Sequence, residues 1–344
     1  MDKNSSQTIS NNLVESPDKK PENHSEEQLD KSYDRDIKST ALPHYLGLIL
    51  LIVTTILWGS TFTITNQVTQ HIPPIFYMTF RYLIGFLVYI PFFCHFRKIN
   101  REFWKITLTA SFLLWASFTL QTIGIQLTTA TKSAFITGLN VIMIPIFAAV
   151  IYKRRVRGII WVSTVLALIG VSIMSFSGFD SIELGDVLVF ICDIFYALYI
   201  LYLERKLPFV GIISFSAFQL AFLSLFSFIS SLIFEVSVNS FVSTFRIFLQ
   251  TPFYWYILYM GVIATSFATI IQMKGQRAVT ATQAAIIYAL EPIFGALFAA
   301  ILGNEDITWQ IIVGGGLIMT GIFLSISKKK KYNFDTERKK SCKK

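Results

Sequence analysis

Apolar residues run along this chain in long blocks that are separated by short polar stretches. Ten blocks contain about 18 or more residues, the length that crosses a hydrocarbon core of ~30 Å. They cover residues 45–65, 74–95, 106–126, 131–152, 159–177, 186–203, 211–234, 253–273, 281–302 and 310–327. In lipid only helices and closed barrels satisfy the backbone, and blocks this long without alternation favour helices. The pattern predicts an all-α membrane protein with ten transmembrane helices.

Composition agrees with a bilayer environment. Of the 344 residues 53% are hydrophobic and 15% are charged, and the mean hydropathy is +0.56. These values exclude an ordinary soluble protein. Neither end shares this character, because residues 1–43 are polar with mixed charge and residues 328–344 are basic. We expect a disordered cytoplasmic tail at the first end and, at the second, a basic tail that attracts anionic membrane lipids.

Lysine and arginine gather in alternate loops. Short basic loops stay in the cytoplasm, so this bias indicates orientation. With the N-terminus inside, the cytoplasmic loops hold Arg97, Lys98, Arg101, Lys105, Lys153, Arg154, Arg155, Arg157, Arg205, Lys206, Lys274, Arg277 and Lys328 to Lys331, against Lys132 and Arg246 outside. The sequence therefore predicts that both termini are cytoplasmic. The membrane expected is a bacterial cytoplasmic (inner) membrane, with an organellar membrane as the alternative. This bias accounts for the net charge of +9, so no nucleic-acid partner is expected.

The second half of the chain repeats the first. Residues 121–176 align with residues 272–327 at a constant offset of 151, and 16 of the 56 positions are identical. Apolar composition alone does not produce the polar and glycine identities, which include Gln121/Gln272, Gly124/Gly275, Thr129/Thr280, Ala130/Ala281, Thr131/Thr282 and Gly170/Gly321. We interpret this similarity as the duplication of a five-helix unit, with repeats over 44–178 and 179–327.

The two repeats are predicted to have opposite orientations, because five is an odd number of crossings. Charges in the aligned loops agree: Lys153, Arg154 and Arg155 align with Asn304, Glu305 and Asp306, and uncharged Ile123 and Gln126 align with Lys274 and Arg277. The fold expected is therefore ten transmembrane helices as two inverted five-helix repeats. This arrangement is typical of secondary transporters that open alternately to either face around a midplane site.

Four segments resemble a known family. They are LWGSTF (57–62), FRYLIGF (80–86), LEPIFGALFAAILGNEDIT (290–308) and IVGGGLIMTGI (312–322). These segments are similar to the EamA-type transporters of the drug/metabolite transporter superfamily, over about residues 45 to 327. The resemblance implies ten helices, a central cavity and solute movement by alternating access, without supplying a substrate.

Glu291 and Pro292 lie inside an apolar block. A charge at mid-bilayer costs roughly 2.5–3.5 kcal/mol on insertion scales, so Glu291 is expected to face the bundle interior. Pro292 removes a backbone donor and predicts a kink that exposes carbonyl groups to a cavity. The alternative is a structural bond from Glu291 to a neighbouring helix. The first repeat has Asn140 and Val141 at these positions, so the cavity is expected to be electrostatically asymmetric.

Two further ionisable residues lie inside apolar blocks. Arg81 follows Pro74 by seven residues, which places it roughly 10 Å deep. It can neutralise an anionic group of the substrate, pair with a protein acid, or extend to the interface. Asp193 lies midway along the sixth block, and its functional interpretation is a proton or cation site that acts with Glu291. The alternative for Asp193 is an Arg or Tyr partner within the bundle.

Other polar and aromatic residues of the apolar blocks are candidates to line the cavity. The complete predicted substrate-binding set is Trp58, Arg81, Trp115, Gln121, Asn140, Tyr196, Gln272, Tyr288 and Glu291. Rings and amides suit flat or amphipathic metabolites. The alternative for each aromatic residue is helix packing or the interfacial belt.

These observations predict a secondary transporter that moves a small polar metabolite, an amino acid or derivative, across the cytoplasmic membrane by alternating access. Its partners are a small-molecule substrate, membrane lipids and a coupling proton or cation. An exchanger of a nucleoside-containing cofactor such as S-adenosylmethionine, or a non-transporting membrane receptor or scaffold, are the alternatives. No HExxH, GxSxG or P-loop motif occurs, so an enzyme is not expected. Cys94, Cys192 and Cys342 lack metal-ligand spacing, and neither a cofactor nor a metal is expected.

Overall fold

The computed structural model describes residues 42–95, 99–127, 133, 136–153, 155–174, 182–235, 238–303 and 308–326. The predicted terminal tails lie outside these residues. The helices are α2 (His44–Thr69), α3 (Pro74–Leu87), η1 (Ile90–His95), α4 (Arg101–Gln126), α6 (Asn140–Ile151), α7 (Gly158–Met174), α8 (Leu184–Lys206), η2 (Leu207–Phe209), α9 (Ile212–Phe234), α10 (Val238–Phe248), α11 (Phe253–Leu258), η3 (Tyr259–Phe267), α12 (Ala268–Gln276), α13 (Ala281–Tyr288), α14 (Glu291–Gly303) and α15 (Trp309–Ile326).

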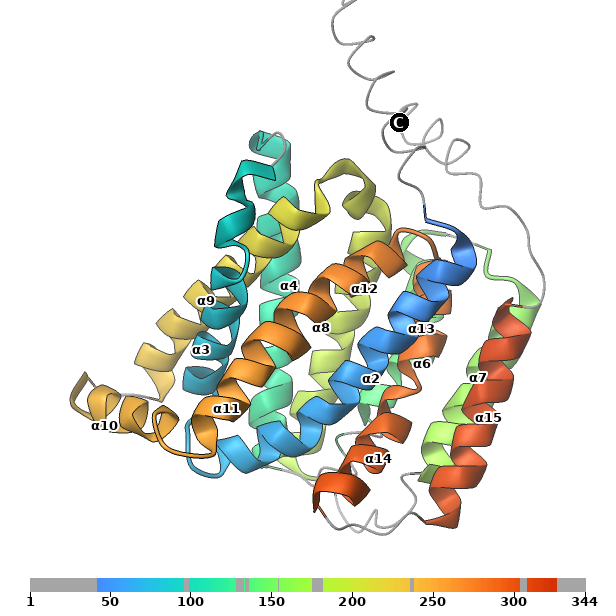
Figure 1. Ribbon diagram of the computed structural model, residues 1–344. Coiled ribbons are helices and arrows are strands. Elements are labelled where there is room, and N and C mark those ends of the chain that lie inside the picture. Colours follow the sequence, from blue (N-terminus) through green and yellow to red (C-terminus); the bar gives the residue numbers. More distant parts are fainter. Residues whose placement is uncertain are drawn as a thin grey trace, which may run out of the picture. The chain divides into compact units, whose positions relative to one another are not determined.

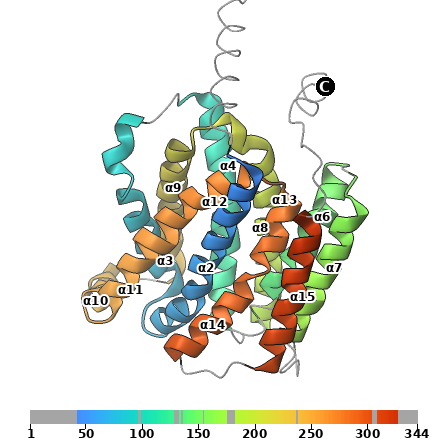
Figure 2. The ribbon, with the colours of Figure 1, turned by 45° about the vertical axis from the view of Figure 1, so that its right-hand side comes forward.

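The helices run up and down through the bundle, and partners distant in sequence pack side by side (Figures 1 and 2). The most extensive pairs are α7 with α15, α4 with α8, and α3 with α9. Helix α2 packs against both α12 and α14. The start of α2 and the end of α15 lie at the same end of the bundle (Figure 1).

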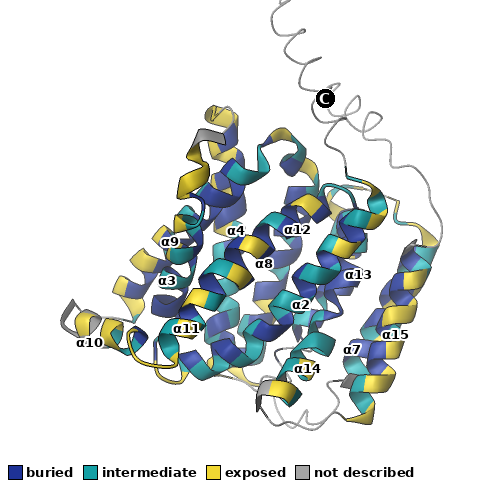
Figure 3. Ribbon diagram, viewed as in Figure 1, coloured by how far each residue is buried: buried dark blue, intermediate teal, exposed yellow. Residues whose placement is uncertain are grey.

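Length and hydropathy identify a membrane protein. Among the described residues six helices are long and apolar enough to cross a bilayer, and four shorter apolar helices cover Pro74–Leu87, Ile136–Ile151, Gly158–Ile173 and Trp309–Ser325. Figure 3 shows exposed positions along the outward faces of the helices. Large apolar residues occupy many exposed positions, for example Val162 on α7 and Ile312 and Phe323 on α15. Water would not tolerate so much exposed apolar surface, whereas lipid matches it.

Helix boundaries reproduce the offset found in the sequence. The starts of α6 and α14, Asn140 and Glu291, are 151 residues apart, and so are the starts of α7 and α15, Gly158 and Trp309. The predicted break at Pro292 is confirmed, because α13 ends at Tyr288 and α14 begins at Glu291. Asn140 and Glu291 therefore occupy the same place, the first residue of a helix that follows an interruption.

Repeat-matched glycines permit close approach of α7 and α15. A Cβ atom on Gly170 would lie 2.5 Å from the backbone oxygen of Gly314, and one on Gly321 would lie 2.8 Å from that of Ser163. Real Cβ atoms do not approach backbone oxygens this closely. Glycine therefore occupies both aligned positions because each of them lies in the same close contact, one on α7 and the other on α15.

Two features of the bundle were not predicted. The block 253–273 is not a uniform α-helix, because its central residues Tyr259–Phe267 form a π-helical stretch. Between α9 and α11 lies the additional helix α10, whose residues 245 and 248 pack on α3. Neighbouring phenylalanine rings at positions 76, 80, 245 and 248 have centroids 5.0 to 6.4 Å apart.

Glu235, the residue after α9, caps the N-terminus of another helix. Its two carboxylate oxygens accept hydrogen bonds from the backbone N–H groups of Ile75 (2.9 Å) and Phe76 (2.8 Å) in the first turn of α3. A carboxylate satisfies donors that have no partner within the helix and complements the helix dipole. Burial raises the pKa of Glu235, and the two N–H donors offset part of this effect.

Replacing Glu235 is expected to destabilise the fold in a pH-dependent way. Glu235→Ala removes the cap and is expected to cost about 0.5–2 kcal/mol. Because the folded pKa is raised above 4.5, the proton bound to Glu235 adds stability that is complete below pH 4.5 and is lost as pH rises through the folded pKa. Glu235→Gln should therefore cost more at pH 5 than at pH 8. Thermal unfolding of both proteins in detergent at pH 5 and pH 8 measures the difference. The same loss of stability in Glu235→Gln at both pH values would contradict the prediction.

Candidate functional site

A cavity lies within the bundle, between helices of both halves of the sequence. The volume of the cavity, counted as the space that the centre of a water molecule can occupy, is about 100 Å³. Since one water occupies ~10–15 Å³ of such space, the cavity has room for several waters or one small organic solute. Its walls come from α2, α3, α4, α6, α8, α9, η3, α12, α13 and α14. Polar groups from distant segments thus meet around one space.

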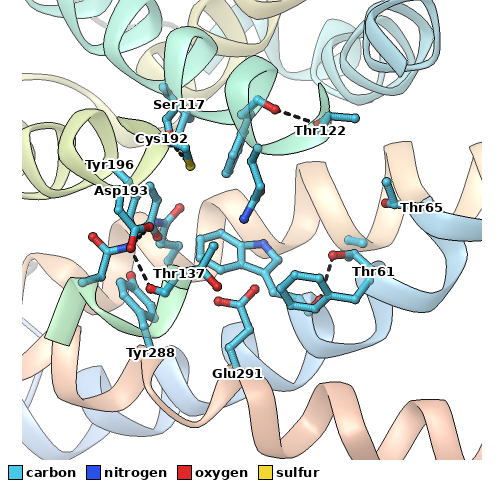
Figure 4. A pocket seen from close by; sticks show the side chains of 18 of the residues that line it. Thr61, Thr65, Ser117, Thr122, Thr137, Cys192, Asp193, Tyr196, Tyr288 and Glu291 are labelled. Carbon is cyan, nitrogen blue, oxygen red and sulfur yellow. Dashed lines mark hydrogen bonds between the residues drawn. The ribbon is translucent and has the colours of Figure 1, made fainter. Parts of the chain in front are cut away.

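The structure brings most of the predicted site residues to this cavity. The predicted residues that line it are Trp58, Arg81, Gln121, Asn140, Asp193, Tyr196, Gln272, Tyr288 and Glu291. Figure 4 shows Asp193 and Tyr288 on one side, with the Glu291 carboxylate directed towards the same space. Their use by a substrate remains a prediction.

Trp115 is the predicted residue that does not line the cavity. Its ring packs against Phe112 on α4 and Phe226 on α9, with both centroids 5.8 Å away. The structure therefore places this tryptophan in helix packing, which was the alternative interpretation of an aromatic residue in an apolar block.

Asp193 on α8 is fully buried and is held by α6. Its Oδ1 atom accepts a hydrogen bond of 2.7 Å from the Asn140 amide, and Glu291 contributes to its electrostatic environment. The interhelical partner is thus Asn140, the repeat equivalent of Glu291, and not the Arg or Tyr considered from the sequence. One carboxyl group, one amide and a second carboxyl group are consequently assembled from α8, α6 and α14.

Several polar atoms at this place are buried without a hydrogen-bond partner in the part of the chain that the structure describes. They include Asp193 Oδ2, Asn140 Oδ1 and the Tyr196 hydroxyl. Native proteins seldom leave buried polar atoms unpaired, and each such atom costs roughly 1–3 kcal/mol. A polar solute or water in the cavity would satisfy them.

Arg81 extends from α3 to the π-helical stretch. Its Nε atom donates a hydrogen bond of 2.8 Å to the hydroxyl of Thr265. The same stretch holds α3 through Ser266, whose hydroxyl donates to the Gly85 carbonyl and whose carbonyl accepts from the Tyr89 hydroxyl at 3.0 Å. The π-helical stretch therefore positions the one arginine that lines the described cavity. Such stretches are frequent at functional sites.

Aromatic rings form the wall beside the acids. The Trp58 and Tyr288 centroids are 5.6 Å apart, Tyr288 and Tyr196 are 6.3 Å apart, and Tyr196 stacks on Phe118 at 6.3 Å. These separations allow mutual contact while leaving ring faces for a ligand.

Sequence reasoning missed most of the hydroxyl groups around the cavity. Thr61, Thr65, Ser117, Thr265 and Thr269 line it, as Figure 4 shows for the first three. Their i, i+4 spacing on α2 and on η3–α12 is a weak signal for one polar face. Within the described residues no group of three His, Cys, Asp or Glu side chains could hold a metal ion.

The two tryptophans provide a test of the cavity's boundary. Trp58→Leu removes a lining ring and is expected to lower solute transport about tenfold, which corresponds to 1.4 kcal/mol. Trp115→Leu changes packing outside the cavity and should leave transport per folded molecule nearly unchanged. Uptake by proteoliposomes, normalised to folded protein, measures both. Equal losses in the two variants would contradict the assignment.

The fold and its cavity define a membrane protein of several apolar helices with an internal cavity lined by both polar and apolar side chains. Membrane transporters belong to this class. A sequence model of the EamA-like transporter family matches residues 45–176 and 183–327. The chain therefore belongs to the EamA-like transporter family. This membership indicates a transporter and not an enzyme.

Proteins with similar sequences also carry the name transporter. An uncharacterized transporter of Archaeoglobus fulgidus is 29% identical over 285 residues, which cover 81% of this chain and 84% of that protein. The uncharacterized transporter YetK of Bacillus subtilis is 24% identical, with 79% and 84% covered. One solved crystal structure superposes with a TM-score of 0.66 at 16% identity and covers 82% of this chain and 97% of that chain, which is a similarity of fold.

Proposed function

We propose that this protein is a secondary transporter that moves a small polar metabolite, an amino acid or derivative, across the cytoplasmic membrane by alternating access. The observation that carries the proposal is the cavity in which Asp193, Asn140 and Glu291 meet, with unpaired polar atoms inside an apolar bundle. Polar groups that converge on one space inside an apolar bundle are what a binding site for a small polar solute requires. Family membership supports the same class.

The proposed architecture is ten transmembrane helices in two inverted five-helix repeats with cytoplasmic termini. Support comes from the equal offsets of α6 and α14 and of α7 and α15, together with the opposite charges of aligned loops. In this arrangement the interrupted helices end at the cavity, and one half can rock against the other around a fixed site.

Asp193 and Glu291 are proposed to carry the coupling proton or cation. They are the carboxyl groups that line the described cavity, and a carboxylate is costly at this depth unless it is paired or neutralised. Binding of a proton or cation on one side and its release on the other would tie the conformational change to a gradient.

Counterflow in proteoliposomes tests the function directly. Purified protein is reconstituted, loaded with a pool of amino acids, nucleosides and S-adenosylmethionine, and supplied outside with each labelled compound at trace concentration. Transient accumulation of one compound establishes a carrier and identifies its cargo. Vesicles without protein are the control. No accumulation of any compound by folded protein would count against this cargo class and favour a receptor or scaffold.

A further inference from the structure

The charges that line the cavity are divided between two places. Asp193 and Glu291 come from α8 and α14, and the rings of Trp58, Tyr196 and Tyr288 surround them. Carboxylates and aromatic faces together are the recognition elements for an organic ammonium group. We name this group of five residues the acidic end.

Arg81 supplies the opposite charge. No carboxylate of the described residues is found within ion-pairing distance of its guanidinium group, whose Nε atom is bound by neutral Thr265. The phenol of Tyr77 lies next to both Arg81 and Thr65. An arginine that lines a cavity in an apolar bundle, with no carboxylate partner among the described residues, is suited to bind a carboxylate or another anion.

The spacing of residues along α2 gives the distance between the acidic end and the surroundings of Arg81. Trp58 belongs to the acidic end, and Thr65 lies beside Tyr77 and Arg81. Seven residues separate these positions, which corresponds to about 10 Å along a helix that rises 1.5 Å per residue. In Figure 4, Thr65 lies on the opposite side of the view from Asp193 and Tyr288.

We propose that the cargo is an elongated dipolar molecule, with its ammonium group at the acidic end and its anionic group at Arg81. This proposal rests on the proposed transport function and narrows its substrate class. In an α-amino acid the two charged groups are only about 3 Å apart by bond lengths, so one molecule cannot occupy both places. A linear peptide of two or three residues spans about 7–11 Å, and an ω-amino acid of similar length has the same charges.

The unpaired atoms are consistent with this occupant. Asp193 Oδ2 and the Tyr196 hydroxyl are buried, line the cavity and have no hydrogen-bond partner in the described part of the chain. An ammonium group donates up to three hydrogen bonds, and Asp193 Oδ2 can accept one. The amides of a peptide would meet the threonine hydroxyl groups along α2 between the two charged places.

Binding of a length series to the purified wild-type protein tests the proposal. The probes are glycine, diglycine, triglycine and 6-aminohexanoate, each also with an acetylated amine and with an amidated carboxyl group. Isothermal titration in detergent is expected to give triglycine or 6-aminohexanoate at least about tenfold tighter binding than glycine. Either cap should remove this advantage. Equal binding of glycine and the longer probes, tolerance of both caps, or no binding by any probe would overturn the proposal.

Two variants assign the ends. In Glu291→Gln, acetylating the amine should weaken binding less than in the wild type, because Asp193 alone remains at the acidic end. In Arg81→Gln, amidating the carboxyl group should no longer matter. The capped probes already test the wild type, so a variant that fails to fold leaves the result intact. Counterflow separates the two proposals: accumulation of a solute without separated opposite charges refutes the dipolar cargo alone, whereas accumulation of neither the metabolite pool nor the probes refutes both.

Discussion

Glu291→Gln is expected to abolish concentrative transport, with a loss of at least about tenfold in gradient-driven uptake. Glutamine keeps the volume and the hydrogen-bonding capacity of the side chain but cannot gain or lose a proton. Glu291 begins α14, lines the cavity and lies near Asp193. Replacing its carboxyl group with an amide therefore removes an ionisable group from the cavity directly. Uptake into proteoliposomes with an imposed pH or sodium gradient measures this effect.

Asp193→Asn should produce a similar loss, because asparagine can still accept a hydrogen bond from Asn140 but does not titrate. Glu102→Gln is the matched control, since Glu102 lies exposed in the first turn of α4 and outside the cavity lining. Full transport by both cavity variants at every pH would refute a coupling role. A loss in all three variants would indicate a general effect of charge removal.

Gly170→Ala is expected to destabilise the bundle by about 1–3 kcal/mol, the range for overpacking a filled interior. The added methyl group would meet the backbone oxygen of Gly314 at 2.5 Å, and a backbone atom cannot rotate away as a side chain can. Helices α7 and α15 would have to separate along their whole contact. The midpoint of thermal unfolding in detergent, followed by circular dichroism, measures the change.

Gly316→Ala on α15 provides the control, because a Cβ atom there has no neighbouring atom within 4 Å. Alanine also favours helix more than glycine does, so this variant should be as stable as the wild type or slightly more so. If both alanine variants unfolded at the wild-type temperature, close approach at Gly170 would not be a determinant of stability.

Local sequence predicted the features that depend on local chemistry. Long apolar blocks gave the helices, and the Glu291–Pro292 pair gave the break between α13 and α14, because proline removes a donor wherever the helix lies. The offset between the halves also reappears in the starts of α6 and α14. These conclusions need no knowledge of which helix faces which.

The remaining features depend on helix rotation and distant contacts. A membrane helix is apolar on both its lipid-facing and its protein-facing sides, so hydropathy could not tell that Trp115 points away from the cavity. The Glu235 cap joins α9 to α3 across 160 positions of sequence, and no local signal announces it. The π-helical stretch likewise has no local signal in its apolar block, and its Thr265 and Ser266 bind α3 at positions about 180 residues away.

In the proposed framework of two repeats, glutamate at 291 and asparagine at 140 make the two halves unequal. Two identical halves would give inward-facing and outward-facing states of equal energy in a symmetric membrane. In the second half, the carboxyl group of Glu291 lies at the cavity, which is energetically unfavourable. In the first half, the amide of Asn140 is already hydrogen-bonded to Asp193. We therefore expect the empty carrier to be open predominantly to one side of the membrane, and the difference between Glu291 and Asn140 to contribute to which compartment it samples first.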